Sequence, residues 1–480
     1  MNLDFTAGLR AALLTAGFTV DGVADLLGEQ AHRPRGRNER TPGLRPTTDG
    51  SPLATLTRLF LLQAPVERAS ADRALPGLVD QLCNAGLLEQ SVSEVAARLD
   101  CRPYTADERD LWVVSDLTPG LDGSPNRVGA DHVLGISSAS TSLAQLTIRE
   151  DVTRALDLGT GCGVQALHLA GHADEVVATD VNTRALGMAR INAALNEVEV
   201  DVREGSFWEP VADERFDLIA TNPPFVISPA TGERLVYRDS GLPGDRVVED
   251  IVRAAPRHLT DGGWCQVLAN WTIERGRGWD ERLATWLSAD TDAFVVQREV
   301  LDPASYVELW LKDEGVPGRP DYPSRYDTWL SWFEAQGIES VGFGWINVRA
   351  GGSGRHTLLE WPYDVEQPIA PAIAQWGAAL EVGVDESRTL LRRSDVQQET
   401  FGAPGAEDPH SVVLRQQRGL RRARSVDTVE AALVGACDGD LSIGQILDAL
   451  SVLLETDRAE LASTYLPVVT ELVREGFLID

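Results

Sequence analysis

The tetrapeptide Asn222-Pro223-Pro224-Phe225 contains the residue types in this chain best suited to chemistry. Two adjacent prolines fix φ and cannot continue a strand, so they make a stiff corner. There, the Asn222 side-chain oxygen and the Pro223 carbonyl can accept hydrogen bonds from both N–H groups of a planar amine or amide. Such bonds localise the nitrogen lone pair and aim it at an electrophile. Phe225 would stack on the flat face of the target, and we expect no metal.

A glycine-rich turn lies about 60 residues earlier, in DLGTGCG at 157–163. A buried strand ends just before the turn, the chain passes through Gly159, Gly161 and Gly163, and a helix begins near Val164. Glycine permits a tight turn and lets a ligand approach the backbone closely. A dinucleotide-binding turn would place its third glycine at 164, so this turn follows a different pattern.

An acidic residue follows the glycine-rich turn at the spacing expected of a ribose-binding carboxylate. The run EVVATD ends in Asp180, about 20 residues after the glycines, where a carboxylate at the end of a second strand can accept hydrogen bonds from ribose hydroxyls. Asp180 could also cap the helix that starts near Thr183. The two roles are compatible.

DLGTGCG and NPPF together resemble the class I S-adenosylmethionine-dependent methyltransferases that carry NPPF or NPPY. That group contains adenine-N6 and guanine-N2 nucleic-acid enzymes and release-factor glutamine-N5 enzymes. The resemblance covers roughly residues 130–310 and implies S-adenosylmethionine as methyl donor, a Rossmann-like sheet, and Asn222 through Phe225 as the reaction platform. The cofactor-binding residues that it implies are Asp157, Gly159, Thr160, Gly161, Gly163, Asp180, Ser206, Phe207, Asn222, Ser140 and Thr141.

Several of these positions have alternatives or depart from the family pattern. Ser206 and Phe207 follow the third strand, where relatives contact the adenine, but many relatives carry an acidic residue in place of Ser206. Ser140 and Thr141 lie in 131–147, which resembles the segment that covers the cofactor, and they could contact its methionine carboxylate or cap the following helix. Further on, the loop 237–245 is a candidate wall of the target pocket, through Tyr237, Arg238 and Asp239.

The elements that must position these residues alternate between strands and helices from about 151 to 310. Such alternation predicts βαβ units and a doubly wound, mostly parallel α/β sheet with helices on both faces. We expect a later run at 341–350 to close the sheet as an edge strand. The other expected strands are 154–158, 175–180, 198–205, 216–221, 263–270 and 293–301.

Three domains are expected. Residues 1–125 form a helical N-terminal domain, because apolar residues recur at helical spacing over 5–18, 20–29, 52–63 and 74–90. Residues 126–352 form the methyltransferase domain. Residues 353–480 form a C-terminal domain that is winged-helix-like at 427–480, where helices precede a terminal hydrophobic strand. Such units contact DNA or serve as packing and protein-contact modules.

The net charge of the chain limits which macromolecules it can bind. The 480 residues carry 43 basic and 73 acidic side chains, a net charge of -30, and a field of that sign disfavours broad non-specific binding to nucleic acid. Two arginine-rich segments are local exceptions and could follow a phosphate backbone or form solvated surfaces. They are 33–45, with Arg33, Arg35, Arg37, Arg40 and Arg45, and 415–424, with Arg415, Arg418, Arg421, Arg422 and Arg424.

Three hypotheses for the function follow. The first is methyl transfer to a nucleic-acid base, adenine or guanine of RNA or DNA, which we favour over protein. The second is methyl transfer to a glutamine or another protein side chain, which suits the acidic surface. The third is a non-enzymatic binding module, against which the glycine turn, Asp180 and NPPF argue together.

Composition also predicts the compartment. No run approaches the ~18 apolar residues of a membrane span, and the first residues lack the pattern of a signal peptide. The five cysteines are scattered, without metal-ligand spacing. We therefore expect a cytoplasmic protein without a membrane partner.

Overall fold

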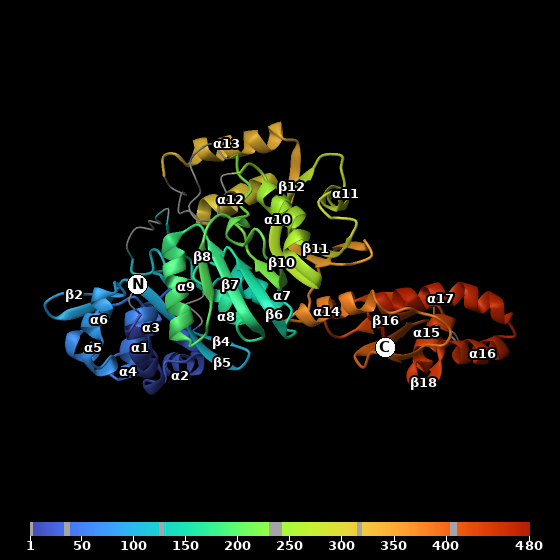
Figure 1. Ribbon diagram of the computed structural model, residues 1–480, viewed down its shortest axis with the longest axis horizontal. Coiled ribbons are helices and arrows are strands. Elements are labelled where there is room, and N and C mark those ends of the chain that lie inside the picture. Colours follow the sequence, from blue (N-terminus) through green and yellow to red (C-terminus); the bar gives the residue numbers. More distant parts are fainter. Residues whose placement is uncertain are drawn as a thin grey trace. The chain divides into compact units, whose positions relative to one another are not determined.

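The computed structural model describes residues 3–32, 39–123, 129, 131–229, 242–313, 319–403 and 410–480. The chain forms two compact units (Figure 1). The first comprises Met1–Ala144 and Glu150–Trp361, and the second comprises Gln145–Arg149 and Pro362–Asp480. The N-terminal region and the main sheet therefore belong to one unit.

An eight-stranded sheet forms the centre of the first unit, in the order β13-β11-β12-β10-β9-β6-β7-β8. Strands β8, β7, β6, β9 and β10 are parallel neighbours, whereas β12 runs antiparallel to both β10 and β11. This confirms the predicted α/β sheet. The strands are β6 (Val152–Leu158), β7 (Ala173–Asp180), β8 (Asp201–Glu204), β9 (Phe216–Thr221), β10 (Leu259–Glu274), β11 (Thr291–Leu301), β12 (Ile338–Ala350) and β13 (His356–Glu360).

The expectation that 341–350 is an edge strand was wrong. Strand β12 lies between β10 and β11, and the edges are β8 and β13. Val341, Ile346 and Val348 are each at most 1 % exposed, as befits a strand enclosed by two neighbours. Sequence order alone does not reveal that the chain inserts its later strand between two earlier ones.

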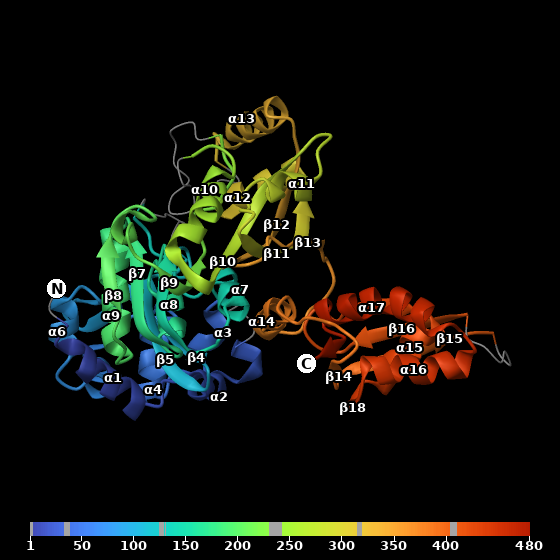
Figure 2. The same cartoon turned by 45° about the vertical axis from the view of Figure 1, so that its right-hand side comes forward.

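Helices cover the sheet (Figures 1 and 2). In α10, the buried residues Val247, Val248, Ile251 and Val252 make one apolar stripe at helical spacing, which explains its packing. The elements are α7 (Ser138–Leu146), α8 (Val164–Leu169), α9 (Thr183–Leu195), η3 (Glu209–Val211), α10 (Arg246–Ala254), η5 (Ala255–His258), α11 (Trp279–Ala284), α12 (Pro303–Asp313) and α13 (Tyr322–Ala335).

The N-terminal region is helical only in its first part. Its helices are α1 (Phe5–Thr15), α2 (Val20–His32), α3 (Thr41–Leu44), α4 (Pro52–Leu56), η2 (Thr57–Leu61), α5 (Arg68–Ala74) and α6 (Val79–Asn84). Its strands are β1 (Val66–Glu67), β2 (Leu88–Gln90), β3 (Glu94–Ala97), β4 (Leu99–Ala106) and β5 (Arg109–Asp116). The expectation of a helical domain up to residue 125 is thus wrong from Leu88 onward.

The β4–β5 hairpin shows why these strands were missed. Ala106 pairs with Arg109 across a two-residue turn. Asp107 and Glu108 have φ of 48° and 61°, so both turn residues are left-handed, as in a type I′ turn. That turn usually contains Asn-Gly or Asp-Gly, and a turn without glycine carries no such signal.

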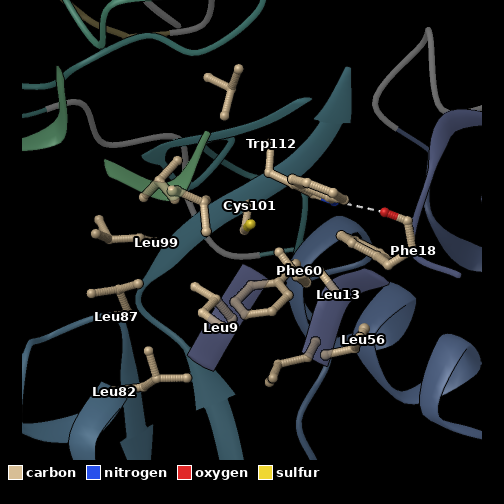
Figure 3. Close-up of a cluster of buried hydrophobic side chains, with 14 of the residues drawn as sticks. Leu9, Leu13, Phe18, Leu56, Phe60, Leu82, Leu87, Leu99, Cys101 and Trp112 are labelled. Carbon is tan, nitrogen blue, oxygen red and sulfur yellow. Dashed lines mark hydrogen bonds between the residues drawn. The ribbon is translucent and has the colours of Figure 1, made fainter. Parts of the chain in front are cut away.

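One hydrophobic core joins the N-terminal region to the sheet domain. Figure 3 shows Leu9, Leu13, Phe60 and other N-terminal side chains packed together, with Trp112 Nε1 donating a 2.7 Å hydrogen bond to the Phe18 carbonyl. The same buried cluster includes Cys162, Val164 and Leu167 at the glycine turn and α8, and Ala185, Met188, Ile191 and Leu195 of α9. The N-terminal region therefore packs directly beneath elements that frame the glycine turn.

The apolar N-terminal helices belong to that core. Across the described residues, no single helix has the length and apolarity to cross a membrane, although Phe5–Thr15 and Val20–Gly28, bent by 45°, pass this test as a pair. Their residues Leu9, Leu13 and Val23 are at most 1 % exposed.

The second unit contains two three-stranded sheets, in the orders β18-β14-β19 and β15-β16-β17. Over 427–480 the order is helix, strand, helix, helix, strand, which is compatible with the winged-helix prediction, and β14 lies between the two strands. The elements are α14 (Ala370–Ala379), β14 (Thr389–Arg392), β15 (Val396–Phe401), β16 (Ser411–Gln416), β17 (Ala423–Val426), α15 (Thr428–Ala436), β18 (Asp438–Ser442), α16 (Ile443–Leu454), α17 (Arg458–Arg474) and β19 (Leu478–Ile479).

Candidate active site

The glycine turn and NPPF follow two adjacent strands. The chain leaves β6 toward β7 and β8 on one side and returns to β9 on the other, so the strand order reverses between β6 and β9. Open α/β sheets bind ligands at the carboxyl ends of the strands at such a switch point. Leu158 pairs with Thr221 at these ends. The structure thus brings the two motifs together, as the sequence predicted.

The glycine turn leaves its backbone open to a ligand. Gly159, Gly161 and Gly163 have φ of 79°, 55° and 89°, where a side chain would be strained. A Cβ at Gly159 or Gly161 would meet nothing within 4 Å, while one at Gly163 would lie 3.3 Å from the Ala189 Cα. Two glycines therefore keep space for a ligand, and the third allows close packing on α9.

Asp157 supports this turn from below. It is 1 % exposed, and its Oδ2 accepts hydrogen bonds from Thr160 Oγ1 at 2.5 Å and from the Ala166 N–H at 2.9 Å. Burial raises the pKa of Asp157 to about 7. The side chain of Asp157 thus fixes the turn and the start of α8, and it would act on a ligand through Thr160 and the backbone.

Asp180 faces the same turn from the end of β7. Its Oδ2 accepts from the Gly161 N–H and its Oδ1 from the Asn182 N–H, both at 2.9 Å. The alternative that Asp180 caps α9 was wrong, because Asn182 is the cap and accepts from the Arg184 N–H at 3.0 Å. Burial raises the pKa of Asp180.

Sequence reasoning missed Val181, the neighbour of Asp180. Its side chain is 64 % exposed beside a carboxylate at the end of a strand. An exposed valine there offers apolar surface to a flat ring next to Asp180, the acid predicted to bind ribose. The available signal was the apolar residue directly after the acid.

Ser206 and Phe207 lie in the turn after β8. The Gly205 N–H donates to the Asp180 carbonyl at 3.1 Å, so this turn lies beside Asp180. Phe207 has a φ of 44°, an unfavourable conformation for an aromatic residue and one that clusters at ligand sites. The structure thus places the turn beside Asp180, while its contact with adenine stays a prediction.

Ser140 and Thr141 lie in the first turn of α7, and their hydroxyls donate to the Ser137 carbonyl at 2.9 and 3.0 Å. Ser137 Oγ accepts from the Ser140 N–H at 3.2 Å, so Ser137 is the residue that caps the helix. Gln165 Nε2 donates to the Ser140 carbonyl at 2.7 Å, which ties this turn to α8. The segment lies near the glycine turn, and its hydroxyls are engaged within α7.

Asn222 presents an unpaired acceptor at the carboxyl end of β9. Its Oδ1 is buried and has no hydrogen-bond partner among the residues that the structure describes. A buried polar atom left without a partner costs about 1–3 kcal/mol, so an empty acceptor at this corner suits a site that awaits N–H donors. The Phe225 ring lies 6.2 Å from that of Trp310 on α12, edge to face.

Some expected residues fall outside the described part of the chain: Tyr237, Arg238, Asp239, Arg33, Arg35 and Arg37. After this gap, the structure describes the chain again from residue 242. The Asp245 carboxylate pairs with the Arg282 guanidinium at 2.7 and 2.8 Å. Both residues are at most 9 % exposed. This pair anchors Asp245, the residue directly before α10.

Three of the described arginines of the two basic segments are engaged in hydrogen bonds or ion pairs. Arg40 donates to the carbonyls of Leu62 and Gln63. In 415–424, Arg415 pairs with Glu399, and Arg424 pairs with Glu430 and Glu475. The two exposed arginines of that segment are Arg418 and Arg421. Within the described ranges, no group of three or more side chains could hold a metal ion.

Comparison with known proteins agrees with this geometry. Residues 135–285 match the family described as methyltransferase small domain. Residues 15–98 and 379–480 match two families, each described as a domain of unknown function.

Three relatives illustrate the range of substrates for which the similar proteins are named. A release factor glutamine methyltransferase from Geobacter sulfurreducens is 37% identical over 23% of this chain and 43% of its own length. A ribosomal protein uL3 glutamine methyltransferase from Bradyrhizobium diazoefficiens is 38% identical, over 34% and 51%. A ribosomal RNA small subunit methyltransferase C from Erwinia tasmaniensis is 28% identical, over 42% and 54%. The chain thus spans about half the length of these curated relatives.

The first unit contains a domain of the class I S-adenosylmethionine-dependent methyltransferase fold. Residues 135–285 match the methyltransferase small-domain family, and this match together with the homologous methyltransferases indicates S-adenosylmethionine as the cofactor. This confirms the resemblance for the family, the fold and the cofactor. The open glycine turn and the Asp180 carboxylate fit that cofactor.

Proposed function

We propose that this protein is an S-adenosylmethionine-dependent N-methyltransferase that acts on a planar amino or amide nitrogen of a macromolecule. The observation that carries the proposal is the buried Oδ1 of Asn222, which has no hydrogen-bond partner among the described residues. It lies at the end of the strand next to the one that leads into the glycine turn. Bound S-adenosylmethionine would supply the sulfonium methyl group, held by Gly159, Gly161 and Asp180.

The protein's own residues would prepare the nitrogen. Asn222 Oδ1 and the Pro223 carbonyl accept its two N–H groups, which draws the lone pair out of conjugation and fixes its direction. Positioning and preorganised acceptors then lower the barrier. Phe225, packed against Trp310, covers the flat face of the acceptor.

The leading candidate acceptor is the exocyclic amino group of a nucleic-acid base. The Erwinia relative is named for methylation of ribosomal RNA. A base reaches such a pocket only when it leaves its stack, so the protein needs few phosphate contacts. Arg418 and Arg421, both exposed, are available for them.

The second candidate is a glutamine side chain of a protein. Two observations favour it: the relatives at 37% and 38% identity are named glutamine methyltransferases, and Arg415 and Arg424 are already paired with acids. The catalytic region 151–310 also has 14 arginines against 27 acidic residues.

An experiment with labelled cofactor distinguishes the two candidate acceptors. The protein is incubated with S-adenosylmethionine labelled on its methyl group and with cell extract, with Asn222→Ala as the inactive control. Label released by RNase or DNase supports the base, and label released by protease supports the glutamine. No label above the Asn222→Ala background in any fraction contradicts the proposed function.

A further inference from the structure

Helix α9 and its C-cap residue carry two buried asparagines one turn apart, Asn192 and Asn196, which are 0% and 6% exposed. Both bind the backbone of β5 in the N-terminal region. Asn196 Oδ1 accepts from the Trp112 N–H at 2.9 Å, and its Nδ2 donates to the Trp112 carbonyl at 2.8 Å. Asn192 binds Val114 in the same way, at 2.7 and 2.9 Å.

The spacing explains why two helical side chains can serve one strand. Residues four apart on a helix rise about 6 Å along its axis, and residues two apart on a strand are separated by about 6.6 Å. A side-chain amide offers one acceptor and a donor, as a peptide group does. The two asparagines therefore replace a strand partner for β5, and they satisfy four backbone groups at that edge.

Asn192 makes one more contact that Asn196 lacks. Its Nδ2 also donates to the Cys162 carbonyl at 2.7 Å, and Cys162 lies between Gly161 and Gly163 in the glycine turn. The corresponding second bond of Asn196 goes to the Asn192 carbonyl, within α9. Only Asn192 thus links β5 to the turn.

We infer that Asn192 is a positioning residue for the cofactor turn and that the N-terminal region, through Val114, holds Asn192 in place. Fixing the Cys162 carbonyl restricts rotation of the adjoining glycines, including Gly161, whose N–H donates to Asp180. The N-terminal region is then a part of the cofactor site as well as a neighbouring domain. This inference rests on the proposed function, because it takes the glycine turn as the cofactor site.

The two asparagines form a matched pair for the test. Asn192→Ala and Asn196→Ala each remove two hydrogen bonds to β5, but only Asn192→Ala frees the Cys162 carbonyl. In the full-length protein, we expect both to lower the Tm by similar amounts, while the Kd for S-adenosylmethionine rises at least tenfold in Asn192→Ala and less than threefold in Asn196→Ala. Equilibrium dialysis measures the Kd, and circular dichroism verifies folding.

Equal changes in Kd for the two variants would overturn the inference. If the alanine variants do not fold, Asn192→Ser and Asn196→Ser are compared in the same assay, since serine leaves a smaller cavity and reaches neither partner. The wild-type protein shows whether the proposed function or only the role of Asn192 has failed. Absence of S-adenosylmethionine binding in the wild type contradicts the proposed function, whereas normal wild-type binding with equal variants contradicts only the role of Asn192.

Discussion

Thr221 Oγ1 donates a 2.7 Å hydrogen bond to the carbonyl of Leu158, so the last residue of β9 is tied to the last residue of β6. Both side chains are at most 1 % exposed. Asn222 and Gly159 are the next residues along each strand. This bond, together with the pairing of β6 and β9, therefore holds the candidate reaction corner next to the candidate cofactor turn.

Replacing Thr221 by valine, which keeps the shape and removes the donor, should slow methyl transfer. We expect a loss of about 1 kcal/mol in the free energy of unfolding, the usual net value of a hydrogen bond. We also expect a kcat about tenfold lower, because small misplacements cost reactivity. Thr179→Val is the matched control, since Thr179 is 1 % exposed and its Oγ1 has no partner among the described residues. Equal kcat in the two variants would show that the bond does not align the site.

Asn222→Ala should separate activity from stability. Removing one preorganised polar group at a reacting centre typically costs 10²–10³ in kcat, so we expect a fall of about that size with the Kd for cofactor changed less than threefold. The Tm should not fall, because the variant deletes a buried acceptor that lacks a partner in the described part of the chain. Single-turnover kinetics and thermal unfolding measure the two effects. Unchanged turnover would remove Asn222 from the mechanism.

Tyr306 should position the chain just after NPPF. Its hydroxyl, on a side chain 0% exposed, accepts from the Ile227 N–H at 2.8 Å and from Asn270 Nδ2 at 3.0 Å. In Tyr306→Phe we expect faster hydrogen exchange at the Ile227 amide and a lower kcat with an unchanged Kd for cofactor. Tyr326→Phe is the control, because the Tyr326 hydroxyl donates to Glu308, an exposed residue of α12. Identical exchange at Ile227 in both variants would argue against this role.

The parts of the fold that the sequence predicted are those with local signals. Glycines with required positive φ, an acid at the end of a strand and two consecutive prolines each constrain the backbone where they occur. Asp180 accepts from Gly161, and the strand before Asn222 pairs with the strand before the glycine turn. The role of α9 cap, which the sequence offered as an alternative for Asp180, belongs to Asn182, a shift of two residues that depends on where the helix begins.

The features that the sequence did not predict depend on distant contacts. The insertion of β12 between β10 and β11 is a choice of pairing between long-range partners. The bonds of Asn192 and Asn196 to β5 join residues 78 and 84 positions apart. Two asparagines four residues apart on a helix otherwise resemble ordinary polar positions.

The last prediction concerns pH. Burial raises the pKa of Asp157 from its ordinary 3.8 to about 7 in the folded protein. Between about pH 4 and 7 the folded state keeps a proton that the unfolded state has lost, so the free energy of unfolding falls as pH rises, by up to about 1.4 kcal/mol per pH unit. Above about pH 7 both states are ionised, and this contribution levels off.

Asp157→Asn isolates that contribution. Asparagine Oδ1 can still accept from Thr160 Oγ1 and the Ala166 N–H, which both bind one oxygen of Asp157, but it does not titrate. Urea unfolding of both proteins at pH 5.5, 6.5, 7.5 and 8.5 should therefore show the variant gaining stability relative to wild type up to about pH 7. Parallel pH profiles for the two proteins would mean that Asp157 is already ionised in the folded state at pH 5.5, and that its bonds to Thr160 and Ala166 outweigh the cost of its burial.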